Sequence, residues 1–254
     1  YGAATKLILT TSPLGFVNRT NFTTQPVITV QDANGNTVEN ASMSIDVSSD
    51  SNDLTGTLRV NVVNGIATFA GLGHAGKIGD KHLTFKKVGG GLTVAVFDYT
   101  LTYGAATKLT RTTDAAGFVN RVNFTVQPVI EIQDADGNKV MPANAQIQIT
   151  SADAEVFNTA TITTSTGVAN FGSATNKVGL KGTVGTRNIK FTLVSDTSIT
   201  VTQSLTLLAG DVAKLGVTVQ PQDTTAGVAF ATTVKVGVQD AWGNAVSSST
   251  VISP

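Results

Sequence analysis

Three copies of one short motif carry the side chains of this sequence that could bind a metal ion. The first copy reads Asp-Ala-Asn-Gly-Asn over residues 32–36, and the second reads Asp-Ala-Asp-Gly-Asn over residues 134–138. Alternate residues of these two copies carry a side-chain oxygen, which is the spacing with which calcium-binding loops begin. The candidate calcium ligands are therefore Asp32, Asn34, Asn36, Asp134, Asp136 and Asn138.

Three features of the motif favour a tight turn over a calcium loop. Its glycine stands fourth rather than sixth, no glutamate follows at the twelfth position, and the third copy, residues 240–244, has Trp242 in place of the middle ligand. The Asp side chain can accept backbone N–H groups, and glycine can adopt a positive φ. We predict structural turns at Gly35, Gly137 and Gly243. Calcium stays open as the alternative, and no other cofactor is indicated.

The two histidines, His74 and His82, are the other side chains that could do chemistry. Their separation is not a familiar metal-ligand spacing. In the repeat alignment described below, His82 becomes Asn188, and His74 falls in a loop that the second copy rebuilds. Catalysis needs a nucleophile and a base, or paired carboxylates, in one pocket. We therefore predict surface or edge-strand histidines and no enzymatic activity.

Trp242, the only tryptophan, stands at the turn where the other copies carry a small polar residue. An exposed aromatic side chain can stack on a sugar or contact a neighbouring module. The alternative is a local packing role. Trp242 is thus a possible ligand or contact residue.

A strand of alternating apolar residues positions each copy of the motif. Two apolar positions flank a position that holds Thr29, Glu131 or Gly237. Such alternation predicts a β-strand with one buried face and one wet face. The residues expected inside are Ile28 and Val30, Ile130 and Ile132, and Val236 and Val238.

The same repeat divides the chain into modules. Tyr1–Leu7 recurs as Tyr103–Leu109 and Gly15–Arg19 as Gly117–Arg121, with a short insertion between Phe171 and Gly185. We predict module 1 over residues 1–102, module 2 over residues 103–208, and the N-terminal part of a third module over residues 209–254. The apolar positions of the third copy would have no second sheet of their own to pack against.

Seven short strands are expected in module 1, separated by turns. Such a pattern is typical of a two-sheet β-sandwich. Asn64-Gly65 gives the clearest signal for a two-residue hairpin. The expected strands are 6–11, 26–31, 43–48, 57–63, 65–69, 82–87 and 92–102.

The composition limits the partners of the chain. Seventeen basic and 17 acidic residues give a net charge of zero, and only 13% of residues are charged. Nothing in this balance attracts nucleic acid or an anionic membrane surface. Cysteine is absent, so packed cores rather than disulfides must supply the stability. The high content of Thr, Ser, Asn, Val and Gly favours an exported all-β protein.

Three sequence features together resemble the bacterial immunoglobulin-like (Big) repeats of invasin- and intimin-like proteins, S-layer proteins and giant surface adhesins. They are Lys-Leu at the first strand, the Gln-Pro-Val strand that runs into Asp-Ala-X-Gly-Asn, and Asn-Gly-Ile-Ala-Thr-Phe at residues 64–69. The resemblance implies immunoglobulin-like modules on the surface of a bacterial or archaeal cell. Because almost no spacer separates the modules at residues 102–105, we predict that the tandem all-β sandwiches form a rod.

The same resemblance implies a structural role in a filament, an S-layer or an adhesin stalk. Its implied partners are neighbouring copies of the protein or further modules of the same chain. The alternative is an adhesive module whose loops recognise a glycan or a surface protein. Neither nucleic-acid binding nor membrane insertion is expected.

Overall fold

The computed structural model describes residues 1–142, 144–164 and 166–247, and the chain divides into two compact units. Unit 1 comprises Tyr1–Thr107 and Gln133–Val140, and unit 2 comprises Lys108–Ile132 and Met141–Pro254. The units therefore do not coincide with the sequence repeats, whose boundaries remain predictions. Every regular element in the described ranges is a β-strand, so the predicted all-β class is confirmed. These ranges contain no helix with the length and apolarity needed to cross a membrane.

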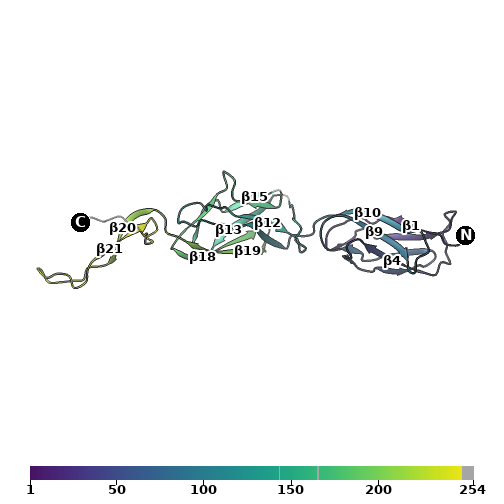
Figure 1. Cartoon of the computed structure of the whole chain (residues 1–254), viewed down its shortest axis with the longest axis horizontal. Helices are drawn as coiled ribbons and strands as arrows, with labels where there is room; N and C mark the ends of the chain where they lie inside the picture. Colours follow the sequence, from purple (N-terminus) through teal and green to yellow (C-terminus); the bar gives the residue numbers. More distant parts are fainter. Residues whose placement is uncertain (143, 165, 248–254) are drawn as a thin grey trace. The chain divides into compact units, whose positions relative to one another are not determined.

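Two antiparallel sheets form most of unit 1 (Figure 1). The first has the order β1-β3-β7 and contains β1 (Lys6–Thr11), β3 (Val27–Gln31) and β7 (Ile66–Thr68). The second has the order β10-β9-β4-β6 and contains β10 (Ala95–Leu101), β9 (Gly79–Lys87), β4 (Ser44–Ser49) and β6 (Arg59–Asn61). A small third sheet joins β2 (Thr20–Asn21), β8 (Gly73–His74) and β5 (Leu54–Thr55).

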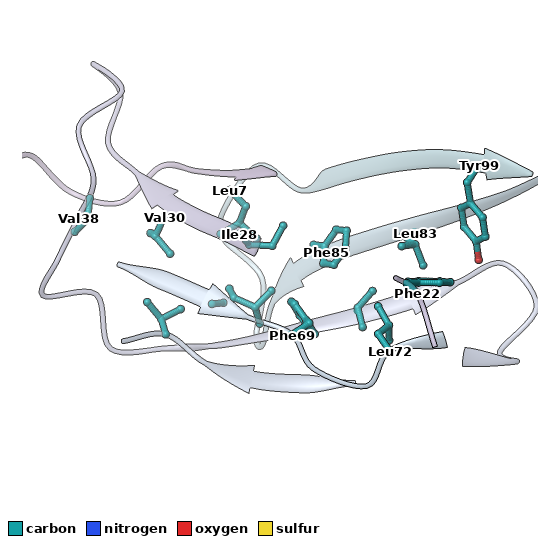
Figure 2. Close-up of a cluster of buried hydrophobic side chains, with 14 of the residues drawn as sticks. Leu7, Phe22, Ile28, Val30, Val38, Phe69, Leu72, Leu83, Phe85 and Tyr99 are labelled. Carbon is teal, nitrogen blue, oxygen red and sulfur yellow. The ribbon is translucent and has the colours of Figure 1, made fainter. Parts of the chain in front are cut away.

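The apolar faces of the two main sheets meet in one core (Figure 2). Ile28 and Val30 of β3 and Phe85 of β9 are fully buried, as the strand periodicity predicts. Phe69 and Phe85 pack edge to face, with their ring centroids 5.4 Å apart. Two sheets that share one apolar core form a β-sandwich, so the predicted sandwich class is confirmed.

Unit 2 repeats this plan. Its sheets have the orders β11-β12-β16 and β15-β13-β18-β19, and its core includes Phe171 against Phe191 at 5.8 Å between ring centroids. Two further pairs are β14 with β17 and β20 with β21. The strands are β11 (Lys108–Thr113), β12 (Val129–Gln133), β13 (Ala145–Ser151), β14 (Glu155–Asn158), β15 (Thr161–Thr164), β16 (Val168–Asn170), β17 (Val178–Lys181), β18 (Gly185–Leu193), β19 (Asp196–Leu207), β20 (Val212–Val219) and β21 (Lys235–Asp240).

The sheet of β20 and β21 leaves several of its apolar residues exposed. Leu215 and Val236 are exposed, as is Phe230 in the segment before β21, although Val236 stands at the repeat position of the buried Ile28 and Ile130. The prediction that Val236 lies inside is therefore wrong for this structure. Among the described strands, β20 and β21 pair only with one another, and the exposure of Leu215 and Val236 means that no described sheet covers these side chains.

Each of the seven expected strands of module 1 overlaps an observed one, and β1 has the expected bounds. The sequence pattern missed β2, β5 and β8, because a two-residue strand is too short to show an alternation. The wet face expected at Thr29 is also wrong. Thr29 is buried, and its hydroxyl lies 3.1 Å from that of Thr10.

The hairpin turn expected at Asn64-Gly65 is confirmed. Both residues have positive φ, at 49° and 77°, and Val63 and Ile66 exchange backbone hydrogen bonds of 2.8 and 3.0 Å. These are the features of a two-residue turn of the mirror-image type. The strands on either side nevertheless belong to different sheets, since β6 pairs with β4 and β7 pairs with β3. The turn thus connects the second main sheet, which contains β6, to the first, which contains β7.

We expect Phe85→Ala to lower the free energy of unfolding of unit 1 by about 3–5 kcal/mol, because it removes a fully buried ring and leaves a cavity. Urea denaturation measures this change. Val96→Ala is the matched control on the neighbouring strand β10, since Val96 is 56% exposed and its truncation should change stability by less than about 0.5 kcal/mol. Equal effects of the two substitutions would contradict the assigned core.

Candidate functional site

The three Asp-Ala-X-Gly-Asn motifs form the same turn. We name them loop 1 (residues 32–36), loop 2 (residues 134–138) and loop 3 (residues 240–244). In loop 2, Asp134 Oδ1 accepts the backbone N–H groups of Asp136 at 3.0 Å and Asn138 at 2.9 Å. Loops 1 and 3 repeat both bonds at 2.9–3.0 Å. The turn glycines Gly35, Gly137 and Gly243 have φ values of 89°, 74° and 101°, a region that favours glycine.

The second oxygen of each loop aspartate is also occupied. Asp134 Oδ2 accepts the N–H of Gly104 at 3.1 Å and the side-chain amide of Asn138 at 2.9 Å. Asp32 receives the same two kinds of bond from Gly2 and Asn36, and Asp240 receives them from Gly210 and Asn244. Each loop aspartate therefore accepts hydrogen bonds from its own loop and from the glycine 30 residues before it.

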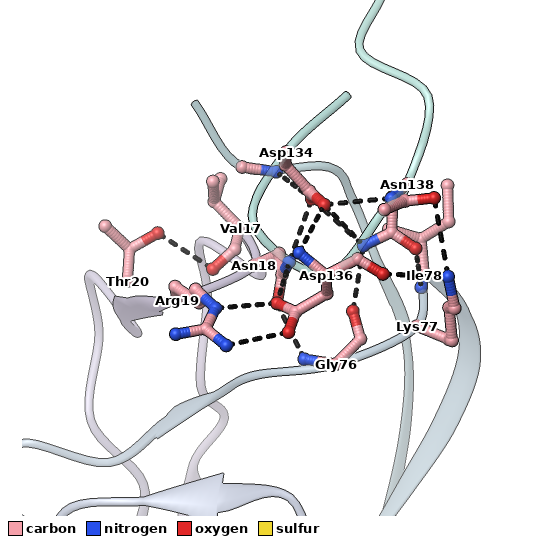
Figure 3. Close-up of polar contacts among 12 residues, drawn as sticks. Val17, Asn18, Arg19, Thr20, Gly76, Lys77, Ile78, Asp134, Asp136 and Asn138 are labelled. Carbon is pink, nitrogen blue, oxygen red and sulfur yellow. Dashed lines mark hydrogen bonds and ion pairs between the residues drawn. The ribbon is translucent and has the colours of Figure 1, made fainter. Parts of the chain in front are cut away.

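In unit 1, a set of residues that we name socket 1 holds loop 2: Asn18, Gly76 and Ile78 (Figure 3). The Asn18 amide donates to Asp134 Oδ2 at 2.8 Å and to Asp136 Oδ2 at 2.7 Å. Asn18 Oδ1 accepts the N–H of Gly76 at 2.9 Å. One buried asparagine side chain thus links the loop to the segment that follows β8.

Asn138 provides the second link between loop 2 and socket 1. Its amide donates to the Gly76 carbonyl at 2.8 Å, and its Oδ1 accepts the N–H of Ile78 at 3.2 Å. Asn18 and Asn138 are each almost fully buried. Since a buried polar group without a partner is costly, every bond that these two amides make contributes to holding the loop.

An ion pair at the edge of socket 1 adds to these contacts. The Arg19 guanidinium donates from Nε to Asp136 Oδ2 at 2.7 Å and from Nη2 to Asp136 Oδ1 at 2.8 Å. The pair is bidentate, but the Arg19 side chain is 56% exposed, so solvent screens the attraction. Lys77 Nζ also donates to the Asp136 carbonyl at 2.8 Å.

Unit 2 contains the same arrangement, which we name socket 2: Asn120, Gly182 and Val184. The Asn120 amide donates to Asp240 Oδ2 at 2.8 Å, and its Oδ1 accepts the N–H of Gly182 at 3.0 Å. Asn244 donates to the Gly182 carbonyl and accepts from Val184, each at 2.9 Å. The main difference is that Trp242 replaces Asp136 in the loop.

Glycine is required where the chain passes each socket. A Cβ added to Gly104 would lie 2.6 Å from the Asn18 carbonyl oxygen, and one added to Gly210 would lie 2.7 Å from that of Asn120. Real Cβ atoms do not approach a backbone oxygen so closely, so a larger residue would push the chain away. The close approach to the Asn18 carbonyl thus explains why the Tyr-Gly-Ala-Ala motif has glycine at residue 104.

Hydrogen bonds keep these carboxylates ionised. Burial is the largest single influence on Asp134 and opposes its ionisation, but the bonds from Asn138, Asn18 and Gly104 together outweigh burial and lower its pKa to about 2. The bond from the Gly2 N–H is the main cause that lowers the pKa of Asp32. The hydrogen bond from Arg19 is the main cause that lowers the pKa of Asp136.

The candidate calcium ligands are in part brought together and in part kept apart. Asp134, Asp136 and Asn138 meet around Asn18, and Asn36 contacts Asp32 in loop 1, whereas the Asn34 side chain is exposed. The carboxylate oxygens already accept N–H groups, and the described residues include no cluster of three or more His, Cys, Asp or Glu side chains suited to a metal. Calcium binding remains a prediction.

The two histidines differ from each other. His82 is exposed and its Nδ1 lies 2.6 Å from Asp98 Oδ1, as expected for a surface histidine. The surface prediction for His74 is wrong, because His74 is fully buried in β8. The prediction that His74 lies in a loop rebuilt in the second copy is also wrong. Gly73 pairs with Asn21 just as Gly179 pairs with Asn123, so His74 corresponds to Leu180 in the structural repeat.

Sequence reasoning missed the sockets. The repeat Gly15–Arg19 and Gly117–Arg121 did contain Asn18 and Asn120, but nothing in the spacing connected them to the loops more than 100 residues later. Trp242, the possible contact residue, is 44% exposed at the tip of loop 3.

No protein-family model and no curated protein matches the chain. Among solved structures it is similar to FdeC, an Escherichia coli adhesin, with 16% identity and a TM-score of 0.42 over 95% of this chain and 75% of that chain. It is similar to invasin, a bacterial integrin-binding protein, with 14% identity and a TM-score of 0.37 over 95% of this chain. The chain spans 48% of the invasin structure, about half its length.

A third similar structure is that of domains 1–6 of the surface layer protein SbsC, with 15% identity and a TM-score of 0.28 over 95% of this chain and 31% of that chain. These structures come from the group of bacterial immunoglobulin-like surface proteins that the sequence resembles. At such scores, the function has to be inferred from the residues of the chain itself.

We expect Asn18→Ala to weaken the hold of socket 1 on loop 2, because it removes the donor to Asp134 and Asp136 and the acceptor for the Gly76 N–H. The loss of a buried partner of charged groups should lower the free energy of unfolding by about 1–3 kcal/mol. Hydrogen exchange of residues 133–140 should accelerate. Asn120→Ala is the matched control and should accelerate residues 240–244 instead. Unchanged exchange of residues 133–140 in the first variant would contradict the role of Asn18.

Acid should destabilise unit 1 through Asp134. Because its pKa is lowered from 3.8 to about 2 on folding, the unfolded chain binds a proton first as the pH falls. The stabilisation is complete above pH 3.8 and is lost as the pH falls towards 2. In Asp134→Asn, the slope of unfolding free energy against pH in this window should be smaller than in the wild type, as followed by urea midpoints. Parallel curves would contradict the prediction.

Proposed function

We propose that this chain is a structural protein of an extracellular bacterial surface, whose immunoglobulin-like modules belong to a filament, an S-layer or an adhesin stalk. The observation that carries the proposal is the recurrence of one contact set. Asn18 with loop 2 and Asn120 with loop 3 share two bonds: each amide donates to the loop aspartate, and each Oδ1 accepts the N–H of a socket glycine. A protein that reproduces one buried polar contact in successive copies uses it to order the chain.

The chemistry of the loops supports a scaffold rather than a reaction centre. An enzyme keeps reactive groups open to a substrate, whereas Asp134 and Asp240 are buried and have their oxygens occupied by N–H donors of the chain. The donors are backbone groups and asparagine amides, which do not change charge with pH. The hydrogen bonds of the chain itself therefore support the loop conformation, and the proposed role is not enzymatic.

The proposed location is outside the cell, and the proposed partners are neighbouring copies of the protein or further modules of the same chain. A chain with no cysteine and few charges fits this setting, because its stability rests on packed β-sandwich cores. The even charge balance gives nucleic acid and anionic membrane surfaces nothing to bind.

A second candidate function is adhesion through the loops. Trp242 supports it, because a tryptophan that is 44% exposed at a loop tip offers a flat surface on which a sugar or a protein side chain can stack. In this proposal the β-sandwiches carry the loop, and the ligand is a glycan or a surface protein.

Immunogold electron microscopy of the source cells tests the leading proposal. Antibodies against the chain should label the outer cell surface or structures attached to it, in cells that have not been permeabilised. Labelling that appears only after permeabilisation, and only in the cytoplasm, would contradict an extracellular scaffold.

Glycan and surface-protein arrays distinguish the two candidates. The scaffold proposal expects no binding that depends on Trp242. Adhesion through loop 3 expects a signal that Trp242→Ala abolishes and that Asn34→Ala, at the same position of loop 1, leaves unchanged. A signal that survives both substitutions would contradict the assigned role of Trp242.

A further inference from the structure

His74 is a titratable group buried next to socket 1. Its carbonyl accepts the N–H of Arg19 at 2.8 Å, and in β8 it faces Thr20 of β2 and Leu54 of β5. Gly76, two residues further along, makes the bonds to Asn18 and Asn138. The histidine therefore lies on the same short segment that holds loop 2.

Both nitrogens of the His74 ring have partners. Nδ1 contacts the Tyr99 hydroxyl, and Nε2 lies 3.1 Å from Ser51 Oγ. A neutral imidazole with its proton on Nε2 satisfies all three groups, since Tyr99 then donates to Nδ1 while Nε2–H donates to Ser51. His74 is fully buried and Tyr99 is nearly so. This network fits an uncharged ring.

Unit 2 provides an internal comparison without this network. Leu180 occupies the position of His74, as shown above. Leu205 occupies the position of Tyr99, because Leu205 pairs with Arg187 as Tyr99 pairs with Lys81. Both leucines are buried, and socket 2 still makes the asparagine and glycine bonds that hold loop 3. The polar pair is therefore not needed to build a socket.

We propose that His74 is an acid-sensitive switch, which loosens socket 1 and releases loop 2 when the ring binds a second proton. The proton comes from solvent and binds Nδ1. The ring then donates from both nitrogens, and Tyr99 must turn its own O–H away from the ring. The charged ring gains solvation only if β8 separates from β2, and that movement breaks the bond from the Arg19 N–H and displaces Gly76.

The groups that face His74 set the direction of its response. Burial has the largest effect and lowers the pKa of His74 below its usual 6.5, and Lys81 on β9 acts in the same direction. Asp53 and Asp50, in the segment around β5, act in the opposite direction. Tyr99 stays neutral because burial raises its pKa, and Arg19 is engaged with Asp136. The balance favours the neutral ring in the closed form.

The sign of the pH dependence follows from this balance. Since the opened form has the higher pKa, it binds more protons below pH 6.5, and the closed form loses stability as the pH falls from 6.5. His82 acts oppositely, because its hydrogen bond with Asp98 raises its pKa and stabilises the folded form at low pH. Global stability would mix the two effects, so the test must be local.

Hydrogen exchange of the full chain between pH 7.5 and 5, corrected for the intrinsic exchange rates, provides that test. Protection of the Gly76 and Ile78 amides, which donate to Asn18 and Asn138, should fall by up to about tenfold per pH unit below 6.5, as expected for one proton. Protection of the Gly182 and Val184 amides of socket 2 should stay constant. This window lies above the range in which the loop aspartates titrate.

The double substitution of His74→Leu and Tyr99→Leu, which installs the pair of unit 2, should keep the Gly76 and Ile78 amides protected at every pH in this range. A pH dependence that persists in this variant, or that affects sockets 1 and 2 equally, would overturn the proposal. A proton NMR titration of His74 in a His82→Asn background gives a second readout that needs no core substitution. A midpoint at or above 6.5 would also overturn it. The switch goes beyond the proposed function, since neither a scaffold nor an adhesive role is required for it.

Discussion

An ionised carboxylate buried in a protein needs donors, and this constraint shapes the loops of the chain. Asp134 is only 1% exposed, and an isolated charge at such a position would be very unfavourable. The tight turn supplies backbone N–H groups, Gly104 supplies another because it has no side chain to block the approach, and Asn18 supplies an amide. If one of these donors is lost, the charge stays buried with fewer partners.

Local sequence patterns were sufficient for the parts of the fold that depend on near neighbours. The alternation around Ile28 and Val30 predicted a strand, because side chains of a strand point to opposite faces with a period of two. Asn64-Gly65 predicted a hairpin turn, because few residues tolerate two consecutive positive φ values. Gly35 and its counterparts were assigned to turns on the same ground, and they do have positive φ.

The rest depends on residues far apart in the chain. Asn18 meets Asp134 across more than 100 residues, and no local pattern encodes that pairing. The burial of His74 was missed because the insertion that shifts the repeat alignment lies between Phe171 and Val178, ahead of its counterpart Leu180. Thr29 was expected at the surface, but it is buried, and its hydroxyl forms a hydrogen bond with that of Thr10 on the neighbouring strand. In each case the missing information was the identity of a spatial neighbour.

The sockets contact their loops in part through backbone groups, which affects how duplicated copies can diverge. Ile78 and Val184 each donate a main-chain N–H, so the change of side chain between them does not alter the bond. Asn18 and Asn120, in contrast, act through their amides and are the same in both copies. After a duplication, mutations can therefore accumulate at most positions around a socket, while purifying selection need act on only a few asparagines, aspartates and glycines.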